Sequence, residues 1–75
     1  MDIFTKQNEE GLSKIKEALF HKVQVRVHAD YETLYGIGFD RWLRQGLQSI
    51  SCTIEIKGYN PWYGYPDTFL ITPKI

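Results

Sequence analysis

The hydrophobic residues of this chain change their spacing near residue 22, and this change restricts the fold more than any other feature. Leu12, Ile15 and Leu19 recur every three or four residues, which is typical of the buried face of an amphipathic helix. From Val23 to Ala29, every second residue is apolar and those between are polar, the pattern of a strand with one buried face. A helix followed directly by a strand predicts a chain of the α+β class.

Capping signals bound the helix. Asn8 is a candidate N-cap, and the two glutamates that follow it suit the positive end of the helix dipole. Gly11 weakens the first turn by about 1 kcal/mol relative to alanine. We therefore expect a helix from Asn8 to His21, with Phe4 as an upstream extension of its apolar face.

Four further segments carry structural signals. Alternating residues predict a second strand over Thr33–Phe39. A short helical turn is expected over Asp40–Gly46, with Asp40 as the N-cap and Gly46 as a left-handed C-cap. Alternation of apolar residues predicts two more strands, over Ile50–Ile56 and Thr68–Thr72.

These elements predict one compact domain over residues 1–75, in which an N-terminal helix packs on a three- or four-stranded antiparallel sheet. The helical turn falls between the second and third strands. Short connections favour antiparallel pairing, because parallel strands need longer crossovers. A helix followed by a small SH3-like barrel is the alternative. A chain of 75 residues buries only about 60% of its unfolded surface, which leaves room for one core.

The charges of the chain balance. Nine basic and nine acidic side chains cancel, so no net field directs the molecule toward nucleic acid or an anionic membrane. A local excess of positive charge does lie between residues 13 and 28. Its members are the candidate nucleic-acid-binding residues of an alternative function: Lys14, Lys16, Lys22 and Arg26.

The expected cellular compartment is inferred from the lack of cysteine pairs, a signal peptide and a membrane-spanning segment in the sequence. A single cysteine, Cys52, cannot form an internal disulfide, and its place among alternating isoleucines indicates packing. The N-terminus lacks the basic start and apolar run of a signal peptide, and no stretch approaches the ~20 apolar residues that span a bilayer. We expect a cytoplasmic protein, in the host cytosol if a phage encodes it, without membrane contact.

Four aromatic rings crowd into one loop between residues 59 and 65. They are Tyr59, Trp62, Tyr63 and Tyr65, and Pro61 and Pro66 stiffen the same segment. Tyrosine and tryptophan offer a large contact area at little cost in side-chain entropy and are enriched at binding hot spots. The competing interpretation is that the rings cover the small core. We expect a mixture, with Trp62 packed and some of the tyrosines turned outward to bind a partner.

Trp42, between Arg41 and Arg44, is the second candidate for partner binding. An exposed tryptophan beside guanidinium groups can stack on a base or enter a partner's pocket. The favoured interpretation is that Trp42 plugs the end of the sheet while both arginines face water.

A catalytic or metal site has little support. Arg26, His28 and Glu55 fall on the polar face of the predicted sheet, where such groups could serve a small ribonuclease. Their spacing is equally that of ordinary exposed strand residues, so we expect no catalysis. His21, His28 and Asp30 fall short of the four ligands that a structural zinc site needs. No metal and no cofactor is expected.

The sequence therefore favours a small non-enzymatic protein that binds another protein as an inhibitor or an adaptor. Compact inhibitors of host enzymes encoded by phages and mobile elements, anti-CRISPR inhibitors among them, share this size and lack of catalytic motifs. A nucleic-acid-binding module is the alternative and a small ribonuclease the third reading. The aromatic loop could also form an interface in a homodimer.

Overall fold

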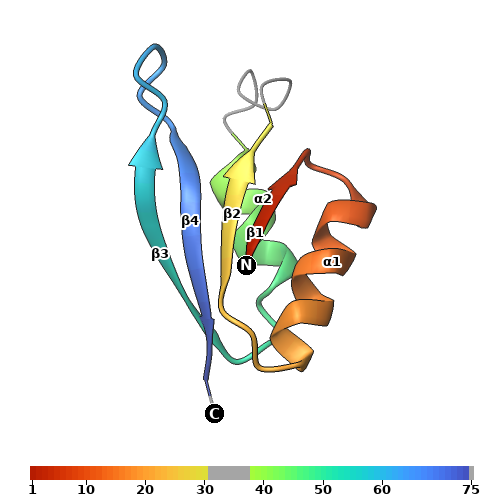
Figure 1. The fold of residues 1–75 in the computed structure, drawn as a ribbon. Helices are drawn as coiled ribbons and strands as arrows, with labels where there is room; N and C mark the ends of the chain where they lie inside the picture. The colour runs from red at the N-terminus through yellow and green to blue at the C-terminus, as the bar shows by residue number, and fades with distance from the viewer. Residues whose placement is uncertain (31–37, 75) are drawn as a thin grey trace.

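The computed structural model describes residues 1–30 and 38–74, which form two helices and a four-stranded sheet (Figure 1). In chain order the elements are β1 (Asp2–Thr5), α1 (Glu9–Phe20), β2 (Val25–Ala29), α2 (Phe39–Gly46), β3 (Cys52–Tyr59) and β4 (Pro66–Pro73). The predicted α+β class is confirmed, and the described strands form an open sheet rather than the alternative barrel. Neither of the described helices is long and apolar enough to cross a membrane.

The sheet is mixed, whereas antiparallel pairing throughout was expected. Its strand order is β1-β2-β4-β3, and β4 pairs antiparallel with both of its neighbours. β1 pairs parallel with β2, placing Ile3 opposite Val27, because α1 returns the chain to the same end of the sheet. The sequence pattern did not predict β1. Phe4, expected on the apolar face of the helix, lies on this strand and is exposed.

Both helices pack on one face of the sheet and enclose the core. Alternate residues of β2 and β4 point into this core, as their spacing predicts. Neither helix covers the opposite face, which carries polar residues such as Arg26 and Glu55. The largest fully buried side chains of the core are Ile15, Val25, Val27, Leu43, Leu47, Phe69 and Ile71.

α1 is one residue shorter at each end than predicted, because Asn8 and His21 are its caps. The Asn8 side chain caps it, since Oδ1 accepts a hydrogen bond from the Gly11 N–H at 2.8 Å. At the other end, Lys22 adopts a positive φ of 62°, and the Val23 N–H donates to the Ala18 carbonyl at 3.0 Å. This is the left-handed ending that closes many helices.

α2 differs from its expected caps at both ends. Gly38 is its N-cap, while Asp40 lies in the first turn and pairs with Arg44. Gly46 is the last helical residue and not a left-handed cap. Its lack of a side chain makes room for the packing of α2 against α1. A Cβ there would lie 2.7 Å from Leu12 of α1, so the glycine lets the two helices approach.

The predicted strands map unevenly onto the structure. The one expected over Thr33–Phe39 lies outside the described residues except at its end, where Phe39 begins α2. The later two are confirmed as β3 and β4, and both are longer than expected. They form a hairpin whose connecting loop, residues 60–65, projects past the rest of the sheet (Figure 1).

Candidate functional site

The tip of the β3–β4 hairpin presents aromatic side chains to solvent. Trp62 is 84% exposed, Tyr59 60%, Tyr63 52% and Tyr65 37%. The expectation that Trp62 packs on the core is therefore wrong. The loop that joins β3 and β4 extends past the ends of both helices (Figure 1), and the indole ring of Trp62 is largely exposed.

Asn60 holds the tip in one conformation. This residue is only 5% exposed, and its Oδ1 accepts hydrogen bonds from the backbone N–H groups of Trp62 at 2.8 Å and Tyr63 at 2.9 Å. Its own N–H donates to the Tyr65 carbonyl, and its carbonyl accepts from the Gly64 N–H. Gly64 has a φ of 75°, a conformation that favours glycine. Hydrogen bonds among its own residues thus hold the turn.

Two of the rings are aligned with each other. Tyr63 and Tyr65 lie nearly parallel, with 8° between their planes and 6.5 Å between their centroids. Because the main chain beneath them is hydrogen-bonded, the backbone of the tip loses little further freedom on binding. The hairpin tip is a preorganised aromatic surface.

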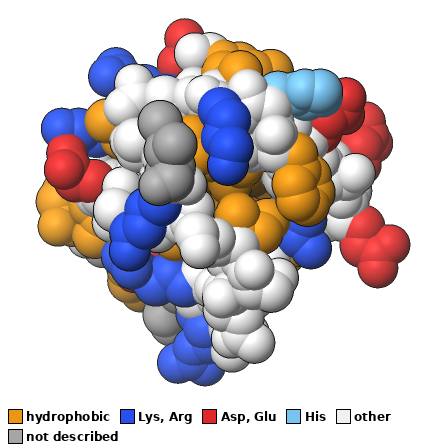
Figure 2. Space-filling view, turned by 90° about the horizontal axis from the view of Figure 1, so that it is seen from below, with side chains coloured by type: hydrophobic (Ala, Val, Ile, Leu, Met, Phe, Trp, Pro, Cys, Tyr) orange, Lys and Arg blue, Asp and Glu red, His pale blue; other side chains and the backbone are white. Residues whose placement is uncertain are grey.

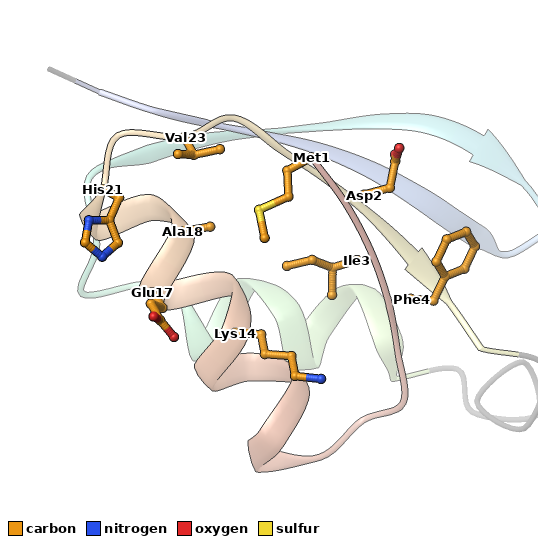
Figure 3. Close-up of a pocket in the computed structure, with 9 residues that line it drawn as sticks. All are labelled: Met1, Asp2, Ile3, Phe4, Lys14, Glu17, Ala18, His21 and Val23. Carbon is orange, nitrogen blue, oxygen red and sulfur yellow. The ribbon is translucent and has the colours of Figure 1, made fainter.

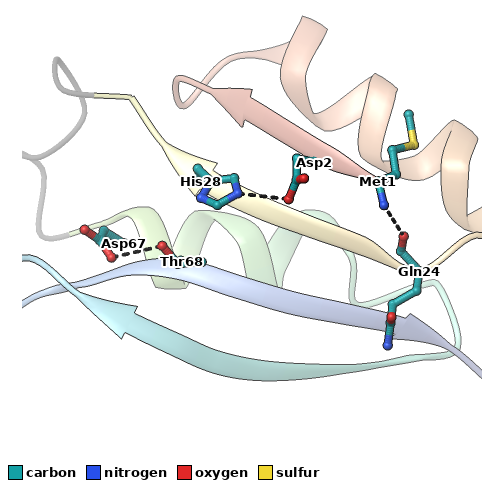
Figure 4. Close-up of polar contacts among 6 residues, drawn as sticks. All are labelled: Met1, Asp2, Gln24, His28, Asp67 and Thr68. Atoms are coloured by element: carbon teal, nitrogen blue, oxygen red, sulfur yellow. Dashed lines mark hydrogen bonds and ion pairs between the residues drawn. The ribbon is translucent and has the colours of Figure 1, made fainter.

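This surface carries no charge of its own. The segment from Gly58 to Pro66 contains no lysine, arginine, aspartate or glutamate. At its two margins, Lys57 forms an ion pair with Glu55, and Asp67 accepts a hydrogen bond from the Thr68 hydroxyl at 3.2 Å (Figure 4). Its contacts are therefore apolar or of the neutral hydrogen-bonding kind.

Removal of the Asn60 side chain is expected to loosen the tip. In Asn60→Ala, the amides of Trp62 and Tyr63 lose their acceptor, and we expect the variant to lose about 1 kcal/mol of unfolding free energy. Hydrogen exchange followed by NMR should show both amides exchanging roughly tenfold faster. Asn60→Asp, which retains the acceptor oxygen, is the matched control and should preserve their protection. Equal protection in the alanine variant would contradict this role.

Trp42 takes the packed role that the sequence favoured. It is half-buried against the core on α2, and its ring lies 5.3 Å from that of Phe39. Arg41 and Arg44 are exposed, and Arg44 pairs with Asp40. Trp42 is thus a smaller fraction exposed than any of the four aromatic residues of the hairpin tip.

The basic residues of the nucleic-acid alternative do not form one surface. Lys14 and Lys16 lie on α1, Lys22 follows its end, and Arg26 lies on the open face of the sheet. Lys14 also pairs with Glu10 at 3.4 Å. The view from below, at the end opposite the hairpin, shows basic side chains interspersed with apolar and acidic ones (Figure 2).

The residues of the ribonuclease reading share a face but do not meet. In the register, Leu70 of β4 separates Arg26 from Glu55, so the two lie about two strand spacings, or roughly 10 Å, apart. Glu55 pairs with Lys57 instead. Among the described residues, no three His, Cys, Asp or Glu side chains gather as a metal site would require.

His28 has partners that the sequence did not indicate. Its Nε2 lies 3.2 Å from Asp2 Oδ1 (Figure 4). Its ring also stacks on Phe4, with the centroids 4.4 Å apart. Both partners belong to β1, where Phe4 lies opposite His28 and Asp2 lies two residues away, opposite Arg26. The burial of every second residue between positions 2 and 5 is typical of a strand. Four residues are too few, however, to distinguish a strand from the start of a helix by sequence.

The Asp2 carboxyl should titrate at a lower pH because of this contact. The hydrogen bond from His28 lowers the pKa of Asp2 below its ordinary value of 3.8. A depressed folded-state pKa stabilises the fold above that ordinary value, and the contribution disappears as the pH falls through the folded pKa. In an NMR titration, His28→Ala should raise the Asp2 midpoint, whereas His21→Ala should leave it unchanged. An equal midpoint in wild type and His28→Ala would rule out the coupling.

Cys52 behaves as a packing residue. It is half-buried at the start of β3 and contacts the core, and burial raises the pKa of its thiol. A raised pKa leaves less of the reactive thiolate at neutral pH.

Comparison of the chain with protein-family models, with curated proteins and with solved structures gave no match. The function must therefore be inferred from the chemistry of this chain's own surface.

Proposed function

We propose that the protein binds another protein through the aromatic hairpin tip, and that it acts as a small inhibitor or adaptor. One observation carries this proposal: four exposed rings stand on a turn that Asn60 already holds in place. Large aromatic side chains dominate the binding energy of protein interfaces. A preorganised loop binds more tightly than a flexible one, because less freedom is lost.

The absence of charge favours a protein over a nucleic acid as the partner. Proteins that stack bases on aromatic rings also need cations nearby to neutralise the phosphates. The segment from Gly58 to Pro66 contains none, and Lys57 beside it pairs with Glu55. A protein partner requires no such cations, since apolar contacts and neutral hydrogen bonds suffice at the centre of an interface.

Affinity capture from the natural host tests the proposal. The tagged wild-type chain should retain a protein through a wash at high salt, because an uncharged contact is only weakly screened. The variant Trp62→Ala plus Tyr63→Ala should lose that protein while keeping the wild-type circular dichroism spectrum. Retention of the same protein by the variant, or recovery of nucleic acid alone that salt removes, would overturn it.

A further inference from the structure

We infer that the free edge of β1 and the groove beside it form a dimer interface, occupied by a second copy of this chain. In the sheet formed by the described residues, β1 and β3 are the edge strands. Edge strands expose unpaired backbone groups that can pair with another chain. This inference goes beyond the proposed function, because it concerns the side of the molecule away from the hairpin tip (Figure 1).

Within the described part of the chain, no strand pairs with the outer edge of β1, which leaves a row of backbone groups for an incoming strand. The Met1 and Thr5 carbonyls accept hydrogen bonds from Arg26 and Asp30, so the odd-numbered residues of β1 direct their backbone groups toward β2. By alternation, the N–H and C=O groups of Asp2 and Phe4 point toward the free edge. In an antiparallel dimer, Asp2 of each copy would pair with Phe4 of the other copy. The twofold axis then passes beside Ile3.

The groove below this edge is lined by apolar residues of β1, α1 and the turn that follows α1. Met1, Ile3, Ala18 and Val23 line it from these elements (Figure 3). Met1 is 67% exposed, and Phe4 on the other face of β1 is 73% exposed. Burial of such side chains between two copies would remove apolar surface from water.

Two of the charged residues that line the groove, Lys14 and Glu17, are self-complementary about the same axis. Gly11 of α1 lies level with Thr5 of β1, since a Cβ on Gly11 would touch the Thr5 side chain. Ile3 lies about 7 Å further along the strand, which corresponds to roughly four to five helical residues at 1.5 Å each. The axis therefore falls between Lys14 and Glu17, both of which line the groove. Lys14 of each copy would face Glu17 of the other.

The other edge is protected against such pairing. β3 alternates exposed polar residues that include Glu55 and Lys57, and its register with β4 shifts on both sides of Gly58. Charged side chains and bulges are common features that prevent edge-to-edge association. β1 has one charged side chain, Asp2, and that side chain is engaged with His28. Pairing is therefore expected at β1 and not at β3.

Sedimentation equilibrium on the full chain, from about 10 µM to 1 mM, tests this dimer. We expect the wild type to dimerise within this range. Lys14→Glu and Glu17→Lys each replace two attractive pairs by two repulsive ones and should raise the dimer Kd about tenfold. The double variant Lys14→Glu plus Glu17→Lys restores complementarity and should return the Kd to within about threefold of wild type. A monomeric wild type, or single variants with unchanged Kd, would overturn the inference.

A backbone variant tests the edge itself. Phe4→Pro removes an N–H that points away from β2, so the bonds within the sheet survive while two bonds of the dimer are lost. Its control, Phe4→Ala, loses the same ring but keeps the N–H, and should dimerise at least tenfold more tightly than Phe4→Pro. Trp62→Ala plus Tyr63→Ala should leave the dimer Kd unchanged. The test of the dimer is therefore independent of the test of partner binding by the hairpin tip. Equal Kd values for the two Phe4 variants would refute strand pairing.

Discussion

Replacing Trp62 by alanine is expected to weaken binding of the captured partner by about 30-fold or more, which corresponds to about 2 kcal/mol. Trp62 is the largest side chain of the hairpin tip and its most exposed one. The Asn60 bonds hold its backbone, so the variant loses contact area without a change in the turn. Combining it with Tyr63→Ala should weaken binding further, by a total of about a hundredfold to a thousandfold. Isothermal titration with purified partner measures both values.

Phe20→Ala is the matched control for this measurement. Phe20 is an aromatic residue of comparable exposure, 72%, but it ends α1 at the opposite end of the molecule from the hairpin. Its removal should change the Kd by less than about twofold if the tip is the binding surface. A loss of affinity in Phe20→Ala equal to that in Trp62→Ala would indicate general hydrophobic adhesion instead of a defined site.

The structure confirms those sequence predictions that depend on local periodicity. α1 follows from the spacing of its apolar residues and from Asn8, whose capping bond is local. β3 and β4 follow from alternation, because one face of each strand packs on the core. In each of these segments the same pattern that selects the secondary structure also selects the buried face.

The features that the sequence did not predict depend on contacts between distant segments. β1 is a strand because Asp2–Thr5 pairs with a segment 24 positions later, and nothing within those four residues requires that pairing. The caps of α2 were misassigned for a similar reason, since Gly46 is set by its contact with Leu12. The exposure of Trp62 depends on how far the hairpin extends beyond the core. The amino-acid composition of the chain does not determine how far the hairpin extends.

Gly11→Ala is expected to destabilise the fold, although helix propensity predicts the reverse. Alanine favours a helix over glycine by about 1 kcal/mol, and on that basis the variant would gain stability. In the structure, a Cβ on Gly11 would lie 1.6 Å from Thr5 Oγ1 and 2.8 Å from Thr5 Cβ. α1 would have to move away from β1, with loss of packing and strain on the Asn8 cap. We expect a net loss of about 2–3 kcal/mol in unfolding free energy.

Urea and thermal unfolding measure this change, and the expected decrease in Tm is about 10–20 °C for a chain of this size. Thr5→Ala separates the close contact from other effects, because it removes the oxygen that the new Cβ would meet. The double variant Gly11→Ala plus Thr5→Ala should be at least about 1 kcal/mol more stable than the sum of the single effects predicts. This coupling would establish that β1, which local sequence does not specify, is held in place by the close approach of α1 at Gly11. A Gly11→Ala variant as stable as wild type would mean that the first turn of α1 does not lie against Thr5.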